Sequence, residues 1–287
     1  MSTRKPTIRD IRSMKQKHEK IAMVTAYDYP SAMACARANA DMLLVGDSLG
    51  MVVLGYDSTL PVTMADMIHH TSAVRRGAPG SFVVTDMPFM SYQASVSDAL
   101  HNAGRLMKEA ACDAVKLEGG QAIVAQVAAM IAAGIPVMGH IGLQPQSVHQ
   151  LGGYRLQGKT AGQAHSLYDD ARRLEDAGCF AIVLECVAEN VAQLIAESLS
   201  IPVIGIGSGP YVDGQVLVFH DLLGINGAYV PSFAKSYKHL LDEMANGVTA
   251  YRDEVRTGSF PPAGQVASVD PAVMAALRKE YNLGGHH

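Results

Sequence analysis

The segment Met42–Gly50, M-L-L-V-G-D-S-L-G, decides the fold because it places acidic and hydroxyl side chains directly after a short apolar run. Four apolar residues are too few for a stable helix. They are typical of a strand buried on both faces, as in a parallel sheet covered by helices. Asp47 and Ser48 are therefore expected at the carboxyl end of this strand.

The same pattern of an apolar run ending in a carboxylate occurs three more times. The further segments are Phe82–Pro88 with Asp86, Ala114–Gly119 with Glu118, and Ala181–Val187 with Glu185. Burying an unpaired carboxylate is costly, and several are tolerated together mainly when a cation neutralises them. We therefore interpret the chain as a scaffold that gathers acids around a metal ion.

An internal repeat supports this regular architecture. Lys108–Glu118 aligns without a gap on Glu175–Glu185, and each segment combines a helix end, a cysteine, a strand and a terminal glutamate. Ile135–Gly142 then recurs as Ile201–Ser208 at nearly the same spacing. A ring of βα units would produce such a repeat, and it would place Glu118 and Glu185 in equivalent positions.

The number of apolar runs predicts the fold class. Strands are expected near Ile21, Met42, Phe82, Ala114, Val137, Ala181 and Val203, with a weaker eighth at Ala228–Val230. Alternation of these runs with helical patterns indicates an α/β protein with a (β/α)₈ TIM barrel, and an open doubly wound sheet is the alternative. We expect one domain over residues 1–287, with an N-terminal helix in 1–20, the barrel core in 21–235, and C-terminal helices and a tail in 236–287.

The composition of the 287 residues excludes several classes of protein. A hydrophobic share of 48% with 17% charged residues argues against disorder, and a net charge of −4 offers no general attraction for nucleic acid. The four cysteines show no zinc spacing, and no apolar run reaches membrane-spanning length. We expect a soluble, cytoplasmic protein that binds neither nucleic acid nor membrane.

The candidate site lies where barrel enzymes place their chemistry, at the carboxyl ends of the strands. Lys116 precedes Glu118 by two residues, so both side chains should point to the same face. A carboxylate cluster favours a hard divalent ion such as Mg²⁺, which polarises a bound carbonyl and suits enolate chemistry. Glu185, in V-L-E-C-V, is the predicted general base.

These residues also have simpler interpretations. Asp47 and Asp86 could cap the elements that follow them, which is a common role of an aspartate after a strand. Glu118 and Glu185 could be rim residues, with Lys116 as their ion-pair partner.

Three further features are ambiguous in the sequence. His140 could be a metal ligand or a hydrogen-bonded rim residue, and Tyr27 could bind substrate or pack in the rim. The glycine-rich run 205–209 could hold a phosphate or form a tight turn.

Motifs across most of the chain resemble those of the ketopantoate hydroxymethyltransferase family. They are T-A-Y-D-Y (Thr25–Tyr29), L-V-G-D-S-L-G-M (Leu44–Met51), D-M-P-F-M (Asp86–Met90), V-K-L-E-G-G (Val115–Gly120), G-H-I-G-L-x-P-Q (Gly139–Gln146) and V-L-E-C-V (Val183–Val187). The resemblance implies transfer of a one-carbon unit from 5,10-methylenetetrahydrofolate to 3-methyl-2-oxobutanoate, giving 2-dehydropantoate in the first committed step of pantothenate synthesis. It also implies Mg²⁺ as cofactor and a homo-oligomer, a decamer of two pentameric rings.

The resemblance further implies a role for each candidate residue. The metal ligands would be Asp47, Asp86 and Glu118; the oxo acid would contact Asp47, Ser48, Asp86 and Lys116; and Glu185 would accept the proton. The region after Pro262, with a helix near its end, is not part of the expected pattern.

Competing functions follow from the same features. The nearest is a Mg²⁺-dependent carbon–carbon lyase or mutase of the isocitrate lyase and phosphoenolpyruvate mutase type, but the cysteine motif that those enzymes need is missing near Gly119–Gln121. A Schiff-base aldolase using Lys116 is less compatible, because a neighbouring carboxylate opposes the depressed pKa that it needs. A catalytically silent barrel acting as a scaffold or sensor is the alternative from another class.

Overall fold

The computed structural model describes residues 4–151, 153, 155–226 and 230–283. The chain forms two compact units, Met1–Lys238 and His239–His287. The expectation that residues 1–287 form one domain remains a prediction.

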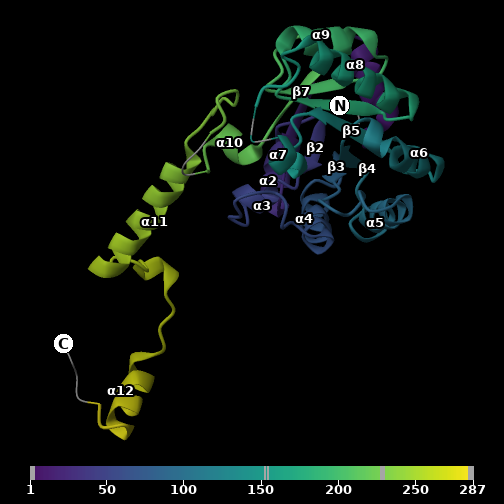
Figure 1. The fold of residues 1–287 in the computed structure, drawn as a ribbon. Helices are drawn as coiled ribbons and strands as arrows, with labels where there is room; N and C mark the ends of the chain where they lie inside the picture. The colour runs from purple at the N-terminus through teal and green to yellow at the C-terminus, as the bar shows by residue number, and fades with distance from the viewer. Residues whose placement is uncertain (1–3, 152, 154, 227–229, 284–287) are drawn as a thin grey trace. The chain divides into compact units, whose positions relative to one another are not determined.

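The first unit is a closed barrel of eight parallel strands (Figure 1), as the spacing of the apolar runs predicts. The strands are β1 (Ile21–Thr25), β2 (Met42–Val45), β3 (Phe82–Asp86), β4 (Ala114–Glu118), β5 (Val137–Gly142), β6 (Ala181–Glu185), β7 (Val203–Ile206) and β8 (Gly214–Leu217). Each pairs in parallel with the next, and β8 pairs with β1 to close the ring. The open doubly wound sheet is therefore wrong.

Helices surround the strands of this unit, as Figure 1 shows for α4, α5, α8 and α9. The α-helices are α1 (Ile8–Gln16), α2 (Tyr29–Arg37), α3 (Leu49–Val52), α4 (Met64–Gly77), α5 (Val96–Glu109), α6 (Val124–Ala132), α7 (Val148–Leu151), α8 (Ala161–Asp176), α9 (Glu189–Ser198) and α10 (Phe219–Leu223), and the 3₁₀ helices are η1 (Gln121–Ile123) and η2 (Pro145–Ser147). Capping boxes start three of them: Thr7 with Asp10 begins α1, Asp28 with Ser31 begins α2, and Thr63 with Asp66 begins α4.

The eighth strand is not where the sequence pattern placed it. Ala228–Val230 falls mainly outside the described residues, and the strand that closes the barrel is Gly214–Leu217. This strand has only four residues, and Gln215 interrupts its apolar character with an exposed side chain. The apolar-run criterion therefore missed it.

Two apolar clusters stabilise the barrel. The inner cluster fills the barrel with strand residues such as Met42, Phe82 and Val183, and Ile11 of α1 belongs to it. The outer cluster contains alternate strand residues, such as Leu43 and Val83, together with the buried faces of the surrounding helices. Because both faces of the strands are buried, their sequences read as continuous apolar runs.

The second unit contains α11 (Leu240–Thr257), η3 (Ala263–Gln265) and α12 (Pro271–Glu280), which confirms the predicted helical C-terminal extension. No residue of these helices is buried in the structure. In the part of the chain that the structure describes, no helix is both long enough and apolar enough to cross a membrane.

Gly214→Ala is expected to lower the free energy of unfolding by about 1–3 kcal/mol, because overpacking strains a closely packed contact. A methyl group at Gly214 would lie 2.4 Å from the Ile21 carbonyl oxygen, where β8 closes the barrel against β1. Urea unfolding measures the change. Gly104→Ala is the control: no atom lies within 4 Å of the added methyl group, and α5 should gain up to about 1 kcal/mol. Equal destabilisation by both substitutions would contradict this account of barrel closure.

Candidate active site

Strand register brings the predicted residues together at the carboxyl ends of β3 to β6. Asp86 is the cross-strand partner of Lys116, and Glu118 is the partner of His140. Lys116 and Glu118 are two residues apart on β4, so they share a face of the strand as predicted. Glu185 ends β6 opposite Gly142.

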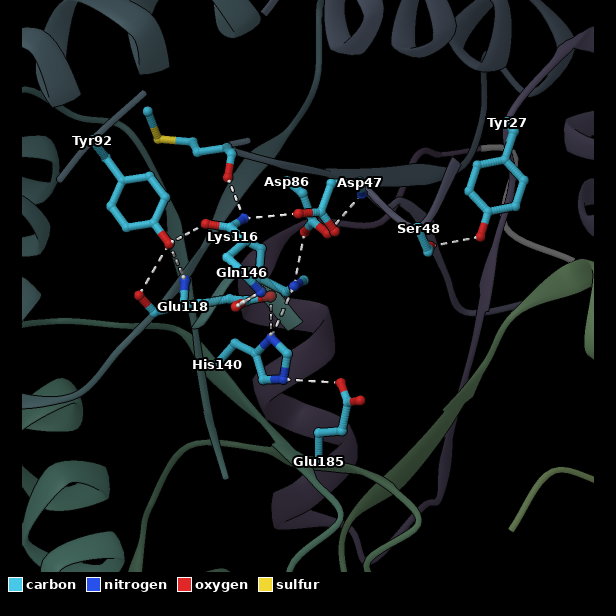
Figure 2. A network of polar contacts seen from close by, with 11 residues as sticks. Tyr27, Asp47, Ser48, Asp86, Tyr92, Lys116, Glu118, His140, Gln146 and Glu185 are labelled. Carbon is cyan, nitrogen blue, oxygen red and sulfur yellow. Dashed lines mark hydrogen bonds and ion pairs between the residues drawn. The ribbon is translucent and has the colours of Figure 1, made fainter. Parts of the chain in front are cut away.

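Lys116 forms a buried ion pair with Asp86 (Figure 2), in which Nζ lies 3.0 Å from Oδ1. Both side chains are about 95% inaccessible to solvent, with side-chain exposures of 4% and 5%. Burial alone would lower the pKa of Lys116, but the carboxylates of Asp86, Glu118 and Asp47 outweigh it and raise the pKa. Lys116 is therefore a protonated cation within the acidic cluster.

Asp47 lies next to this ion pair, and its backbone N–H donates a hydrogen bond to Asp86 Oδ2 at 3.1 Å. Burial raises the pKa of Asp47 well above its ordinary value, and repulsion from Asp86 and Glu118 adds to the effect. Burial also raises the pKa of Asp86, against the opposing effect of Lys116. Burial thus disfavours the charged forms of Asp47 and Asp86, although Lys116 lies beside them.

The capping interpretation fails for Asp47, because the neighbouring Ser48 is the N-cap residue of α3. Ser48 Oγ lies 2.8 Å from the hydroxyl oxygen of Tyr27, as Figure 2 shows. Burial raises the pKa of Tyr27, so its hydroxyl stays protonated. The tyrosine therefore supports Ser48 at the edge of the site.

His140 joins the two glutamates of the site (Figure 2). Its Nε2 lies 3.2 Å from Glu185 Oε2, and its Nδ1 lies 3.5 Å from Glu118 Oε1. Burial and the Lys116 ammonium lower the pKa of His140, but the contacts with Glu118 and Glu185 raise it to about 9. The imidazole is therefore a polar partner of both glutamates, which favours the interpretation of His140 as a hydrogen-bonded residue.

The sequence interpretation assigned no role to Gln146 and Tyr92, which the structure places among the acids. Gln146 Nε2 donates to Asp47 Oδ2 at 2.8 Å, and Tyr92 donates its hydroxyl to Gln146 Oε1 at 2.7 Å. Gln146 is the last residue of the G-H-I-G-L-x-P-Q motif, and its place in this motif is the sequence feature that could have identified it as a site residue. Tyr92 lies in the loop after β3 and had no comparable signal.

The backbone turns sharply after Glu185. Cys186 adopts a φ of 49°, in the left-handed region that is unfavourable for a residue with a side chain. The turn is held from both sides: the Cys186 N–H donates to the Ile206 carbonyl, and the Cys186 carbonyl accepts from the Gln157 N–H. This strained turn places Glu185 at its position in the site.

The glycine-rich run 205–209 forms a tight turn beside β6. Gly207 and Gly209 have φ values of 64° and 79°, and a methyl group on Gly209 would lie 2.5 Å from Glu189 Cγ. The space next to this turn is therefore filled by protein side chains, which favours the tight-turn interpretation.

The donor set fits a hard cation. Asp47, Asp86 and Glu118 could supply oxygen ligands. Burial raises the pKa of Asp47, and repulsion from Asp86 and Glu118 adds to the effect. Gly46 keeps the space beside them open, since a methyl group there would lie 2.8 Å from Ser48 Oγ and 3.5 Å from Asp86 Oδ2. Within the described residues, no three histidine, cysteine, aspartate or glutamate side chains already form a metal-binding group. Mg²⁺ usually keeps water or substrate oxygens among its ligands in proteins.

Comparison with protein families gives a match to ketopantoate hydroxymethyltransferase over residues 5–263. A relative from Moorella thermoacetica, named 3-methyl-2-oxobutanoate hydroxymethyltransferase, is 57% identical over 255 residues, which cover 89% of this chain and 95% of that protein. A relative of the same name from Carboxydothermus hydrogenoformans is 56% identical over 271 residues, covering 94% and 98% of the two chains. The match to the family ends near the start of η3, before α12.

Solved structures with the same fold are much more distant in sequence. A 2,3-dimethylmalate lyase of the PEP mutase/isocitrate lyase superfamily has a TM-score of 0.57 at 14% identity, covering 96% of this chain and 98% of that chain. A phosphonopyruvate hydrolase in complex with oxalate and Mg²⁺ has a TM-score of 0.59 at 10% identity, covering 96% and 97%. These similarities support the barrel fold alone.

Proposed function

Because this chain belongs to the ketopantoate hydroxymethyltransferase family, we propose that it transfers a hydroxymethyl group from 5,10-methylenetetrahydrofolate to 3-methyl-2-oxobutanoate. The product is 2-dehydropantoate, in the first committed step of pantothenate synthesis. The observation that supports the proposal most directly is the buried cluster of Asp47, Asp86 and Glu118 around Lys116, with Glu185 beside it.

Mg²⁺ is the proposed cofactor, held by Asp47 and Asp86, with Glu118 completing the site directly or through water. When bound, it supplies Lewis-acid polarisation of the 2-oxo group, which acidifies the C3–H of the oxo acid. The four carboxyl groups of Asp47, Asp86, Glu118 and Glu185 outnumber the two cationic groups beside them, Lys116 and His140, which supports a divalent ion in this role.

The oxo acid would contact Asp47, Ser48, Asp86 and Lys116. The protonated Lys116 provides positive charge for the substrate carboxylate or for the negative charge that develops on the substrate. Ser48, supported by Tyr27, supplies a hydroxyl group at the edge of the same cluster.

Glu185 is the proposed proton acceptor. It removes the C3 proton, and the enolate carbon forms the new C–C bond to the one-carbon unit. Tetrahydrofolate leaves, and water supplies the oxygen of the new hydroxymethyl group. His140 contacts Glu185 through Nε2 and thereby orients the carboxylate. The same contact keeps Glu185 close to Glu118 and Lys116, since His140 Nδ1 faces both of them.

The alternative functions are less compatible with this site. The lyase and mutase type is supported by fold similarity only, whereas the family match covers residues 5–263. A Schiff-base mechanism needs a neutral lysine, but the surrounding carboxylates raise the pKa of Lys116. A silent scaffold would not need the costly burial of several acids next to one another.

The proposal is tested by incubating the purified protein with 3-methyl-2-oxobutanoate, 5,10-methylenetetrahydrofolate and Mg²⁺. Formation of 2-dehydropantoate, followed by mass spectrometry, is expected and should stop when a chelator removes the metal ion. Omitting the folate provides the matched control. Absence of product from a folded protein that binds both substrates would contradict the proposed function.

We also propose that the enzyme acts in the cytoplasm as a homo-oligomer, with a decamer as the expected assembly. The family resemblance supports the decamer. The cysteines Cys35, Cys112, Cys179 and Cys186 are free thiols, which agrees with a reducing compartment.

A further inference from the structure

Gln146 is a buried residue to which the proposed reaction assigns no role. It lies in η2, shortly after β5, and contacts two of the proposed metal ligands. Its side-chain Nε2 donates to Asp47 Oδ2 at 2.8 Å, and its backbone N–H donates to Glu118 Oε2 at 3.0 Å. One residue therefore connects the carboxylate of Asp47, just after β2, with that of Glu118 at the end of β4.

The Gln146 amide is held in one orientation by four hydrogen bonds. Nε2 donates to Asp47 and also to the Met87 carbonyl at 2.9 Å. Oε1 accepts from the Tyr92 hydroxyl at 2.7 Å and from Gln93 Nε2 at 3.1 Å. A flipped amide would place Oε1 against the Met87 carbonyl and the Asp47 carboxylate, which are both acceptors. The surroundings therefore fix Nε2 toward Asp47.

This fixed donor matters because Asp47 lies close to other acids. The Asp47 backbone N–H donates to Asp86 Oδ2, and Gln146 also donates to Glu118 Oε2, so hydrogen bonds connect all three acids. In the described part of the chain, Gln146 is the only side chain that donates a hydrogen bond to the Asp47 carboxylate. The two hydrogen bonds from Gln146 each engage one carboxylate oxygen, Oδ2 of Asp47 and Oε2 of Glu118.

We infer that Gln146 is a positioning residue, which holds Asp47 and Glu118, through one oxygen of each, in the orientation that binds a hard divalent cation. The inference rests on the proposed function, because it takes both carboxylates as metal ligands. Gln146 itself touches neither reactant in this account and acts only through the two acids and Tyr92.

Gln146→Met tests the inference, because methionine has a similar length but no amide donor. Calorimetry with Mg²⁺ alone, without the oxo acid, is expected to show metal affinity about 10–100-fold weaker than in the wild type, the range typical for loss of a partner that orients a ligand. Tyr92→Phe is a second, milder variant. It removes the hydroxyl donor to Gln146 Oε1, together with the contacts of that hydroxyl with the Glu118 backbone. It keeps the contacts of Gln146 with both acids, so a smaller loss in the same direction is expected.

Gln126→Met is the matched control. Gln126 is a buried glutamine of α6 that donates to the Tyr92 backbone carbonyl and contacts none of the acids, so its loss should leave Mg²⁺ affinity unchanged. A purely structural role of Gln146 would lower the unfolding temperature while the folded variant kept wild-type metal affinity, and that result would overturn the inference. Equal affinity in wild type and Gln146→Met, including no binding by either, would overturn it too. A wild type that binds Mg²⁺ but forms no dehydropantoate would contradict only the proposed function.

Discussion

Glu185→Gln is expected to slow deuterium exchange at C3 of 3-methyl-2-oxobutanoate by about 10²–10⁴-fold, the range that a positioned general base contributes. Glutamine has nearly the same shape as glutamate, and its amide oxygen can still contact His140 Nε2, which lies 3.2 Å from Glu185 Oε2. The substitution thus removes the basic group with little change in packing. Proton NMR in deuterated buffer, with Mg²⁺ and without folate, measures the exchange.

Binding of the oxo acid should survive the same substitution. Lys116 and the proposed metal ligands remain in place, so calorimetry with Mg²⁺ should give affinity for 3-methyl-2-oxobutanoate close to that of the wild type. Glu189→Gln is the control, since Glu189 is an exposed residue at the start of α9 and should exchange at the wild-type rate. Unchanged exchange in Glu185→Gln would remove Glu185 from the role of base.

Asp86→Asn should weaken Mg²⁺ binding at least about 100-fold. Losing a residue that only orients a metal ligand weakens binding by up to about this factor, and Asp86 is proposed to bind the metal directly. The substitution keeps the shape of the side chain but removes its charge. It also leaves Lys116, which lies 3.0 Å from Asp86 Oδ1, without its nearest anionic partner. Calorimetry with Mg²⁺ alone measures the loss, and product formation should fall with it.

Thermal unfolding without metal separates the two effects of Asp86→Asn, since loss of one partner of a buried ion pair destabilises a fold by about 3–5 kcal/mol. Asp113→Asn is the control for charge removal from a strongly paired aspartate. Asp113 forms ion pairs with Arg75 and Lys5 just before β4, at the opposite end of that strand from Glu118. The Asp113→Asn variant should therefore bind Mg²⁺ with the affinity of the wild type. Wild-type affinity in Asp86→Asn would exclude Asp86 as a metal ligand.

Much of the barrel could be predicted because its strands are buried on both faces. Seven strands read as apolar runs, and each begins close to its predicted position. The eighth could not be read in this way, because Gly214–Leu217 is short and alternates buried with more exposed residues. Its place in the sheet is set by close contact between Gly214 and Ile21, which are far apart in the sequence.

Some residues of the candidate site could likewise be predicted from the sequence, and others could not. Asp86, Glu118 and Glu185 end their strands and Asp47 closely follows β2, so position along the chain was enough to find them. The roles of His140 and Gln146 depend on which side chains lie next to them in the folded protein. His140 has Glu118 as its neighbour only through the register of β4 with β5.

The sequence by itself determined that this protein is a βα barrel with acids and a lysine at the carboxyl ends of its strands, because strand burial and side-chain alternation are local properties of the chain. Only the tertiary structure decided how these groups are paired: Lys116 with Asp86, His140 with both glutamates, and Gln146 with Asp47 and Glu118. The physical reason is that charge, burial and hydrogen bonding act over a few ångströms in space, whatever the separation of the residues along the chain.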